Sequence, residues 1–396
     1  MRSVMNERIW PVELLPKPIS KLSDPNPKYP AKAVILAEGH WRDGFAKTGH
    51  GLLIHGRRYE IVAVIDSTLK GRDAGEVIGI GKKGVPIVSS LKDALKFSPD
   101  ALIIGVATIG GYLPEGYREV VEEALRKGLD VVSGLHYFLS EDPKLRRLAK
   151  RSSVKIIDVR KPPPELKVLD ESGWSVDKPI ITVVGSDCEV GKRTTEIELA
   201  IAAEEEGIEV GWIATGQTGI LIGAEEGVVC DRLPSDFVAG EIERRIVRLR
   251  EKGKELIVTA TQGGILHPAY GQVGLGILYG SYPDVIIYAY APRFFRKGFK
   301  TFKVPEIEVE LNMIRRLLIN SLGYDVPLTG ISVNAKGLTN KEFLRLKEEL
   351  ESRYEVPVVD VLKEGARKLL EHSLRVIKKG TPKAEYREYV LKSLKG

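Results

Sequence analysis

The chain has few of the residues that build covalent or metal cross-links. Its 396 residues include only two cysteines, Cys188 and Cys230, and six histidines. Two cysteines cannot form the disulfide framework of a small secreted protein or the cysteine set of a structural zinc site. We therefore expect no metal centre in this chain, and a reducing, cytoplasmic environment.

Long apolar runs and blocks of like charge are missing as well. No segment approaches the roughly 20 consecutive apolar residues that a membrane-spanning helix needs. The net charge is +6, and basic residues alternate with acidic ones, as in Glu243-Arg244-Arg245. These patterns predict neither a membrane nor a nucleic acid as a partner. The expected partner is a small molecule.

Strand-like apolar runs alternate with helical segments through nearly the whole chain, which predicts parallel α/β architecture. The prolines of Lys161–Pro164 favour an extended connector and mark the clearest boundary. Residues 1–30 are broken by prolines and lack a signal-peptide core. We predict four regions: an N-terminal arm over residues 1–30, a Rossmann-like domain over 31–160, a linker over 161–178 and a P-loop NTPase-like α/β domain over 179–396.

The periodicity also predicts the individual elements. In the first domain we expect strands at Ala31–Ala37, Glu60–Ile65, Val85–Ser89, Ala101–Ala107, Asp130–Ser133 and Val154–Asp158. In the second we expect them at Ile180–Val184, Val210–Ala214, Leu256–Ala260, Val285–Tyr290, Gly330–Val333 and Val356–Val359. We expect helices at Gly116–Lys127, Lys144–Arg151, Arg193–Glu206, Phe237–Glu251, Glu308–Leu322, Lys341–Arg353 and Ala366–Lys379.

The first domain lacks the glycine fingerprint of a dinucleotide site. The segment after its first strand, Glu38–Gly44, does not read G-x-G-x-x-G. Asp66, at the end of the second strand, would suit a ribose hydroxyl, but without the glycines it does not indicate a bound dinucleotide.

A glycine-rich loop follows the predicted strand Ile180–Val184 and precedes a predicted helix. Strand, loop and helix in this order form a phosphate-binding P-loop, in which backbone N–H groups and the positive end of the helix face one point. We therefore predict that this loop binds a ligand carrying phosphates. Its residues are Gly185, Ser186, Asp187, Cys188, Glu189, Val190, Gly191, Lys192, Arg193, Thr194 and Thr195.

The loop departs from the standard pattern G-x-x-x-x-G-K-[ST] at two places. Ser186 occupies the first glycine position, and Arg193 stands where a hydroxyl normally binds Mg²⁺. Thr194 or Thr195 can still bond an inner phosphate. The longer loop resembles that of dethiobiotin synthetase. Cys188 is either a small packing residue or a thiol activated by Lys192 and the helix N-terminus.

Other loops follow strands of the second domain, and such loops converge above a P-loop. His267 lies in a glycine-rich loop and is either a general base or a structural histidine. Asp236 is an N-cap of the next helix, a functional carboxylate, or both. Arg293 either holds a carboxylate or phosphate or belongs to a solvated basic loop. Gln217 and Gln262 are further candidates for contacts with the substrate.

Several phrases resemble, in combination, a two-domain family long catalogued as of unknown function and associated with D-glutamate N-acetyltransferase activity. The resemblance spans roughly residues 30 to 370, and it implies a homo-oligomer. One run differs, because Ala260-Thr261-Gln262-Gly263 lacks the acid of the family's Glu-Gly-Gln-Gly pattern. The matching phrases are Ala46-Lys47-Thr48, Gly134-Leu135-His136, Asp158–Pro163, Gly185–Thr195, Gly216-Gln217-Thr218-Gly219, Ser235–Gly240 and His267-Pro268-Ala269-Tyr270.

The resemblance implies transfer of an acetyl group from acetyl-CoA to the amine of an amino acid such as D-glutamate. The P-loop would hold the phosphates of CoA, and His267 or Asp236 would deprotonate the amine. Arg293 or Arg296 would bind the substrate carboxylate. The alternative is a ligase or kinase that uses ATP or GTP with Mg²⁺. A third interpretation is a nucleotide sensor without catalysis.

Overall fold

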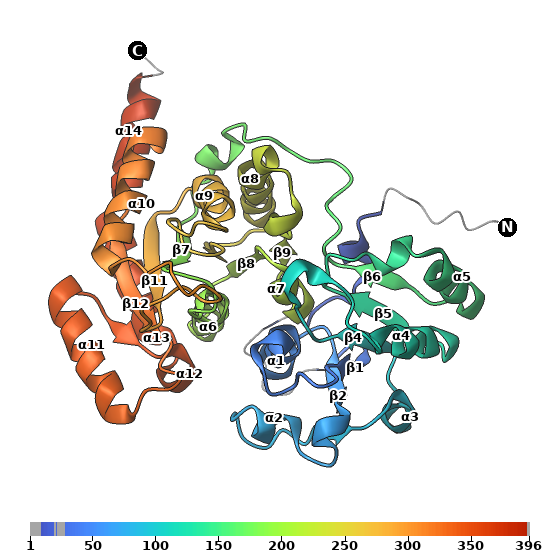
Figure 1. Cartoon of the computed structure of the whole chain (residues 1–396). Helices are drawn as coiled ribbons and strands as arrows, with labels where there is room; N and C mark the ends of the chain where they lie inside the picture. Colours follow the sequence, from blue (N-terminus) through green and yellow to red (C-terminus); the bar gives the residue numbers. More distant parts are fainter. Residues whose placement is uncertain (1–8, 20, 22–27, 394–396) are drawn as a thin grey trace. The chain divides into compact units, whose positions relative to one another are not determined.

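The computed structural model describes residues 9–19, 21 and 28–393 (Figure 1). The chain forms two compact units, Met1–Glu165 with Gly216–Arg232, and Leu166–Thr215 with Leu233–Gly396. Part of the predicted N-terminal arm, residues 1–8, 20 and 22–27, lies outside the described residues. In the rest of the arm, Trp10 donates its indole N–H to the carbonyl of Lys161 at 2.8 Å.

The first unit contains a six-stranded sheet in the order β3-β2-β1-β4-β5-β6. Every neighbouring pair in it is parallel. This order is that of a doubly wound Rossmann sheet, which confirms the predicted fold class. The strands are β1 Lys32–Leu36, β2 Glu60–Ile65, β3 Ile87–Val88, β4 Ala101–Ile104, β5 Asp130–Ser133 and β6 Ile156–Asp158.

The helices of this unit pack on a sheet whose central strands, β1 and β4, are buried except at Lys32. Asp66 caps the turn after β2 and accepts the backbone N–H groups of Trp41 and Thr68 at 3.0 and 3.1 Å. Its carboxylate therefore has a local structural role. The helices are α1 Lys47–His55, α2 Ala74–Val77, α3 Leu91–Ala94, α4 Tyr117–Arg126 and α5 Pro143–Ser152.

The segment Gly216–Arg232, with α7 Gln217–Ile222 and β9 Glu226–Gly227, belongs to the first unit. The sequence predicted an uninterrupted second domain from residue 179 to the C-terminus. The reason for the difference is Arg58, whose buried guanidinium donates to the carbonyls of Ile220 and Ala224 at 2.8 and 3.1 Å. Burial lowers the pKa of Arg58 to about 10.

The second unit is built on parallel strands in the order β13-β12-β11-β7-β10-β8. β7, which leads into the glycine-rich loop, lies between β11 and β10 at the centre. The predicted strands of this domain are thus confirmed, with small changes at their ends. They are β7 Ile180–Gly185, β8 Val210–Ala214, β10 Leu256–Ala260, β11 Val285–Tyr290, β12 Leu328–Val333 and β13 Val358–Val359.

Helices cover both faces of this sheet (Figure 1). Two of them, α6 and α13, pack on one face and on each other, and α8 and α9 pack together on the other face. The helices are α6 Lys192–Glu205, α8 Ser235–Glu251, α9 Gly271–Ser281, α10 Ile307–Leu322, α11 Asn340–Tyr354, α12 Val361–Glu364, α13 Arg367–Lys379 and α14 Pro382–Ser393.

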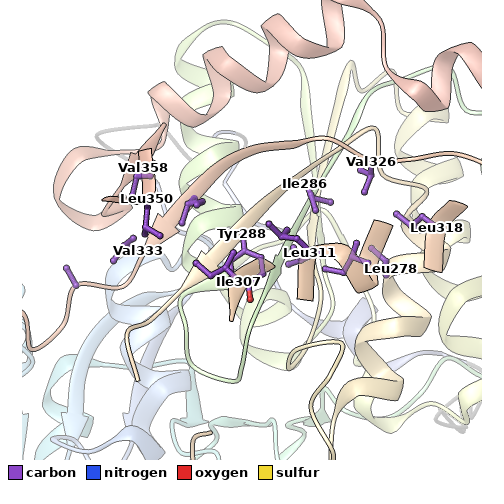
Figure 2. Packing of buried hydrophobic residues seen from close by; sticks show 14 of the residues in the cluster. Leu278, Ile286, Tyr288, Ile307, Leu311, Leu318, Val326, Val333, Leu350 and Val358 are labelled. Atoms are coloured by element: carbon purple, nitrogen blue, oxygen red, sulfur yellow. The ribbon is translucent and has the colours of Figure 1, made fainter. Parts of the chain in front are cut away.

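The core of the second unit lies between α9, α10, α11 and the sheet (Figure 2). Ile307, Leu311, Ile314 and Leu318 recur at helical spacing along α10 and form its apolar face, which packs against Ile286 and its neighbours on the strands. Burial of such side chains contributes about 25 cal/mol per Å² of apolar surface. This packing holds α10 against β11. The segment that follows β11 contacts the glycine-rich loop.

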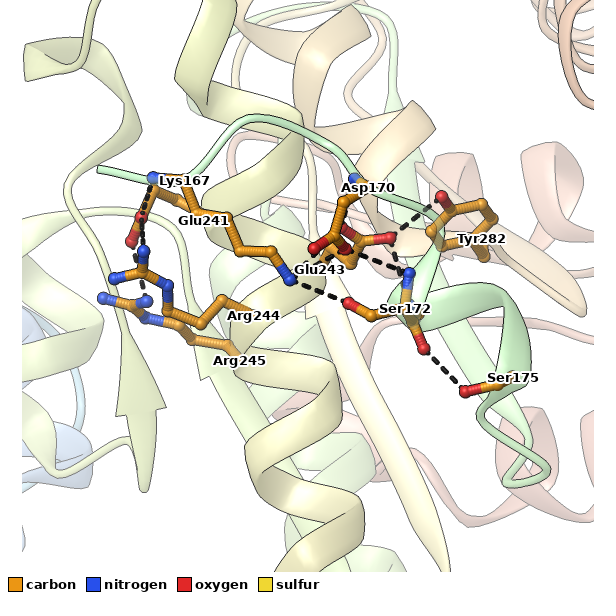
Figure 3. A network of polar contacts seen from close by, with 10 residues as sticks. Lys167, Asp170, Ser172, Ser175, Glu241, Glu243, Arg244, Arg245 and Tyr282 are labelled. Atoms are coloured by element: carbon orange, nitrogen blue, oxygen red, sulfur yellow. Dashed lines mark hydrogen bonds and ion pairs between the residues drawn. The ribbon is translucent and has the colours of Figure 1, made fainter. Parts of the chain in front are cut away.

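The segment predicted as a linker is bound to α8 by two buried glutamates (Figure 3). Glu243 accepts the backbone N–H groups of Asp170 and Gly173, both at 3.0 Å, and the hydroxyl of Tyr282 at 3.1 Å. Glu241 accepts the N–H of Lys167 at 2.8 Å and pairs with Arg245 at 2.7 Å. We call this group the linker network: Lys167, Asp170, Gly173, Glu241, Glu243, Arg245 and Tyr282.

Among the described helices, none combines the length and the apolar character required to cross a membrane.

Candidate functional site

The glycine-rich loop joins the end of β7 to the first turn of α6. Two of its residues have positive φ, Glu189 at 56° and Gly191 at 105°. Such turns point successive backbone N–H groups into one concavity, which suits an anion. Gly185 allows the close approach of β11, because a Cβ atom there would lie 2.5 Å from the carbonyl oxygen of Ala289. The local sequence therefore builds the cradle that the P-loop pattern predicts.

Lys192 is the first residue of α6, and its side chain turns back into the loop. Its Nζ donates to the carbonyl of Asp187 at 2.6 Å. Burial lowers the pKa of Lys192, although Cys188, Glu310 and Asp187 favour its charged form. The ammonium group and the positive end of a 14-residue helix therefore act at the same point.

Asp187 is fully buried and holds the loop to the segment after β11. Its Oδ2 accepts the backbone N–H of Lys297 at 2.7 Å and lies 3.3 Å from Nη1 of Arg293. Arg293 also donates to the carbonyls of Cys188 and Glu189 at 3.3 and 3.2 Å. Arg293, predicted to contact substrate, is thus placed where its charge reinforces the loop.

His267 reaches the loop from the segment after β10. Gly264 makes this possible, because a Cβ atom there would lie 2.4 Å from the carbonyl oxygen of Ser186. Nε2 of His267 lies 3.3 Å from Oδ1 of Asp187. We call Asp187, Cys188, Lys192, His267 and Arg293 the P-loop cluster.

The hydrogen bonds of His267 determine its tautomer. Nδ1 accepts the backbone N–H groups of Ala269 and Tyr270 at 3.1 and 3.3 Å. Burial lowers the pKa of His267, with Asp187 opposing the shift, so the ring is neutral near pH 7. A neutral ring that accepts at Nδ1 carries its proton on Nε2. In this state His267 presents a donor to the P-loop cluster, and a role as base requires this proton to leave first.

Glu310 on α10 is a buried acid that the sequence analysis missed. Its Oε2 accepts the hydroxyl of Tyr288 at 3.0 Å and its Oε1 accepts the N–H of Leu266 at 3.4 Å. Burial raises the pKa of Glu310. A signal for it exists in the sequence, since Glu310 falls three residues after Ile307, on the apolar face of its helix. The chain has Ala260 where the family pattern has an acid, and Glu310 on α10 supplies a carboxyl group near the same loop.

Arg296 is a further cation that contacts the glycine-rich loop. Its guanidinium donates to the carbonyls of Ser186 and Leu266 at 2.7 and 2.9 Å. It therefore ties the glycine-rich loop to the loop that carries His267.

The first turns of α6 contain a second buried polar group. Thr195 is committed to structure, because its hydroxyl bonds Ser332 Oγ at 2.7 Å and the carbonyl of Gly191 at 3.1 Å. Arg193 Nε, Glu196 Oε2 and Trp212 Nε1 are buried atoms without a hydrogen-bond partner in the described part of the chain. Burial raises the pKa of Glu196 to about 8, although Trp212, Arg193 and Lys192 oppose the shift.

The remaining predicted site residues are Gln262, Asp236 and Gln217. Gln262 donates to the carbonyl of Thr215 at 2.5 Å. Asp236 is exposed, and its Oδ1 lies 3.4 Å from the hydroxyl of Ser235. The prediction that Asp236 caps α8 is wrong: the N-cap is Pro234, in an extended conformation, and the helix begins at Ser235. Gln217 is the first residue of α7 and belongs to the first unit.

The first unit carries a polar group at the carboxyl ends of β5 and β6. Arg160 forms an ion pair with Asp231 and donates to the carbonyl of Gly134 at 2.6 Å. Nε2 of His136 lies 3.9 Å from the same carboxylate, and burial lowers the pKa of this histidine. A cavity of about 690 Å³ lies at the opposite edge, beside Lys32 and Glu60. Parallel sheets bind ligands at their carboxyl ends, so the His136 edge is the better candidate.

A Rossmann-like domain followed by a P-loop α/β domain defines the class of this protein. Residues 67–162 match the DUF1611 N-terminal model, described as a Rossmann-like domain of unknown function. Residues 167–370 match the DUF1611 C-terminal model, described as a P-loop domain of unknown function. The chain belongs to this family.

Its relatives include two named enzymes and one solved structure. The chain is 33% identical over 279 residues to a D-glutamate N-acetyltransferase from Pseudoalteromonas sp, covering 70% of this chain and 82% of the relative. It is 33% identical over 283 residues to one from Tritonibacter scottomollicae, covering 71% and 83%. A DUF1611 family crystal structure from Anabaena variabilis is 29% identical, with a TM-score of 0.80 over 87% of this chain and 99% of that one.

Proposed function

We propose that this protein is an N-acetyltransferase that moves an acetyl group from acetyl-CoA to the amine of an amino acid such as D-glutamate, with the P-loop binding the phosphates of CoA. The names of the relatives support an acetyltransferase-like enzyme. Acetyl-CoA as the cofactor and an amino acid as the acceptor extend that likeness.

The observation that carries the proposal is the chemistry at the start of α6. Arg193 occupies the position of the hydroxyl that binds Mg²⁺ in nucleotide-hydrolysing P-loops, and the Thr195 hydroxyl is bonded to Ser332. Arg193 follows Lys192 in sequence and adds a second positive charge to the first turn of α6, and cations there favour a bound phosphate. CoA carries a pyrophosphate and a 3′-phosphate that need binding but no hydrolysis, so a P-loop with a cation at this position suits it.

The acceptor requires a group that recognises its carboxylate and a neutral amine for attack. Arg293 and Arg296 provide positive charge beside the loop, although both also donate to main-chain carbonyls. The Nε2–H of His267 faces Asp187 of the glycine-rich loop, which supports a proposed role as a donor to negative charge on the ligand.

Calorimetric titration with acetyl-CoA and with ATP, each with and without Mg²⁺, tests the proposal. We expect acetyl-CoA to bind without the metal, Lys192→Ala to abolish binding, and Arg193→Thr to weaken it. Lys341→Ala, at an exposed position on α11, is the matched control. Tight binding of ATP only with Mg²⁺, unaffected by Arg193→Thr, would instead favour the ligase or kinase.

Acetyl transfer to D-glutamate, L-glutamate and other amino acids, followed by release of free CoA, then identifies the acceptor. Absence of transfer to every amine tested, with acetyl-CoA bound, would contradict the proposed reaction.

A further inference from the structure

Three segments of the first unit, far apart in the sequence, meet at the carboxyl ends of β5 and β6. His136 lies in the loop after β5, and Arg160 lies in the turn after β6. Gln217 and Asp231 come from the later segment that belongs to this unit. Arg160 is buried, pairs with Asp231 Oδ1 and donates to the carbonyl of Gly134 at 2.6 Å. We call the group the first-unit cluster: His136, Arg160, Lys161, Gln217, Asp231 and Arg232.

Gln217 is a buried side chain whose amide has no partner. The residue is only 7% exposed, and it packs so closely on Gly134 that a Cβ atom there would lie 2.7 Å from its Cγ. Its amide forms no hydrogen bond with any part of the chain that the structure describes, yet neither polar atom is fully covered. Buried polar groups normally have partners. This amide therefore keeps a donor and an acceptor for a molecule bound at this edge.

His136 and Asp231 leave room for a nitrogen between them. Nε2 lies 3.9 Å from Oδ2, too far for a hydrogen bond, and both side chains are about one-third exposed. A nitrogen can lie about 2.9 Å from both atoms and donate to each. Burial lowers the pKa of His136, and Arg160 and Arg232 act in the same direction against Asp231, so the ring is neutral near pH 7. A neutral ring with its proton on Nδ1 accepts at Nε2.

Two cations lie near this pair. Arg232 follows Asp231, and its guanidinium carbon lies 5.0 Å from the centre of the Phe138 ring. Nζ of Lys161 lies 5.3 Å from the same ring centre and 3.2 Å from the carboxylate of Glu141, which is 66% exposed. An exposed ion pair contributes little, so both cations can bind a carboxylate. The cluster thus combines acceptors for one ammonium group with cations for two carboxylates.

The structure of CoA separates the acceptor from the glycine-rich loop. The thioester of acetyl-CoA lies at the opposite end of the molecule from the phosphates that the loop is proposed to bind. Arg293 and Arg296 donate to carbonyls of Cys188, Glu189 and Ser186, so their charge serves the loop. An acceptor therefore needs a binding site built from other residues.

We infer that the first-unit cluster binds the acceptor, and that the acceptor is an amino acid with an acidic side chain. This inference rests on the proposed function and places the acceptor in the first unit instead of beside Arg293 and Arg296. Asp231 Oδ2 and His136 Nε2 accept from the ammonium group. Arg232 and the Gln217 amide bind one carboxylate, and Lys161 binds the other. Arg160 is a positioning residue that holds Asp231 through Oδ1.

Steady-state acetylation of D-glutamate and L-glutamate by the full-length protein, with each substrate varied in turn, tests the inference. We expect Arg232→Gln and Gln217→Ala to raise the KM for the acceptor about tenfold, and Asp231→Asn about a hundredfold, with the KM for acetyl-CoA unchanged. Arg232 is exposed, so its variant tests the site without disturbing the fold. Arg147→Gln, at an exposed position on α5, is the matched control and should keep both KM values.

Alanine, which has one carboxylate, tests the acidic side chain. Lys161→Gln should raise the KM for glutamate about tenfold and leave the KM for alanine unchanged. Equal KM values for alanine and glutamate in the wild type would contradict recognition of a second carboxylate.

Calorimetric titration with D-glutamate, with and without CoA, measures binding apart from turnover. If the wild type acetylates glutamate and the variants of Asp231, Gln217 and Arg232 keep its KM, the inference fails while the proposed function stands. A rise in the acceptor KM for Arg293→Gln alone would return the acceptor to the loop. If the wild type acetylates no amine but binds glutamate through these residues, the proposed function fails and the site stands. Binding of NADH that Asp231→Asn abolishes, without binding of glutamate, would overturn the site.

Discussion

Two buried polar groups of the second unit differ in how completely their atoms are paired. In the linker network, both carboxylates of α8 have donors at both oxygens, including backbone N–H groups of Lys167, Asp170 and Gly173. In the P-loop cluster, Asp187 Oδ1 and His267 Nε2 face each other at 3.3 Å but form no hydrogen bond within the described residues, although both side chains are as deeply buried.

This difference distinguishes buried charged groups that stabilise the fold from buried charged groups that act on a ligand. A buried carboxylate whose oxygens all accept hydrogen bonds holds its surroundings in one arrangement, and removing it leaves several donors unpaired. A buried group with free capacity costs stability until something binds to it. We therefore expect substitutions in the linker network to change stability, and substitutions in the P-loop cluster to change ligand binding and turnover.

The largest effect on stability is expected for Glu243→Ala. It removes the acceptor of Asp170 N–H, Gly173 N–H and the Tyr282 hydroxyl, so the free energy of unfolding of the second unit should fall by about 4 kcal/mol. The corresponding fall in Tm is roughly 10 °C. Protease cleavage within residues 166–178 should increase as the segment is released.

Glu251→Ala, at the exposed end of α8, is the control for this substitution and should leave Tm and cleavage unchanged. An unchanged Tm for Glu243→Ala would show that the network does not stabilise the unit.

A smaller, pH-dependent effect is expected at Glu196, the unpaired acid of α6. Its pKa in the folded chain is about 8, against an ordinary value of 4.5. The folded chain therefore keeps a proton that the unfolded chain releases in this window. The stability that this proton provides is complete below pH 4.5 and is lost as pH rises through 8, at about 1.4 kcal/mol per pH unit.

Urea unfolding of wild type and Glu196→Gln at pH 6 and pH 7.5 measures this term. We expect wild type to lose about 2 kcal/mol more than the variant across the window. Glu205→Gln, at the exposed end of the same helix, should follow wild type. Parallel pH profiles for Glu196→Gln and wild type would show that Glu196 is ionised in the folded chain.

The smallest effect on stability is expected for His267→Asn. The Asn oxygen can replace Nδ1 as acceptor for Ala269 and Tyr270, while the donor at Nε2 and the packing of the buried ring on Tyr270 are lost, so stability should fall by about 1 kcal/mol. Turnover should fall by roughly 100-fold or more, since one donor to negative charge on the ligand is removed.

His267→Ala separates the two roles of this ring. It leaves two backbone N–H groups without their acceptor, at a cost of about 1 kcal/mol or more for each. Full turnover in both variants would remove His267 from the mechanism.

Much of the fold could be predicted because most of its strands are short, uninterrupted apolar runs. β8, β10 and β11 have the predicted bounds. The helix α9 was missed, because Gly274, Gly276 and Gly280 lower helix propensity. Tertiary packing explains those glycines: a Cβ atom at Gly280 would lie 2.2 Å from the carbonyl oxygen of Ala239 on α8.

The candidate site was predictable only in part. The P-loop follows from local order of strand, loop and helix, so its position could be read directly. The contact between Asp187 and His267 joins residues far apart in sequence, and it depends on how closely two loops approach. Glu310 was missed because a glutamate in the first turn of a helix is ordinarily a surface residue that favours the helix dipole.

The contacts of Arg58 with a later segment of the chain affect when the first unit can fold during synthesis. The acceptors of this guanidinium are carbonyls of Ile220 and Ala224, and the hydroxyl of Thr48 pairs with that of Thr218 at 3.0 Å. When synthesis has reached residue 165, Thr218, Ile220 and Ala224 have not yet been made. The first unit can therefore complete the contacts of Arg58 and Thr48 only after translation has passed the phosphate-binding loop and reached residue 232.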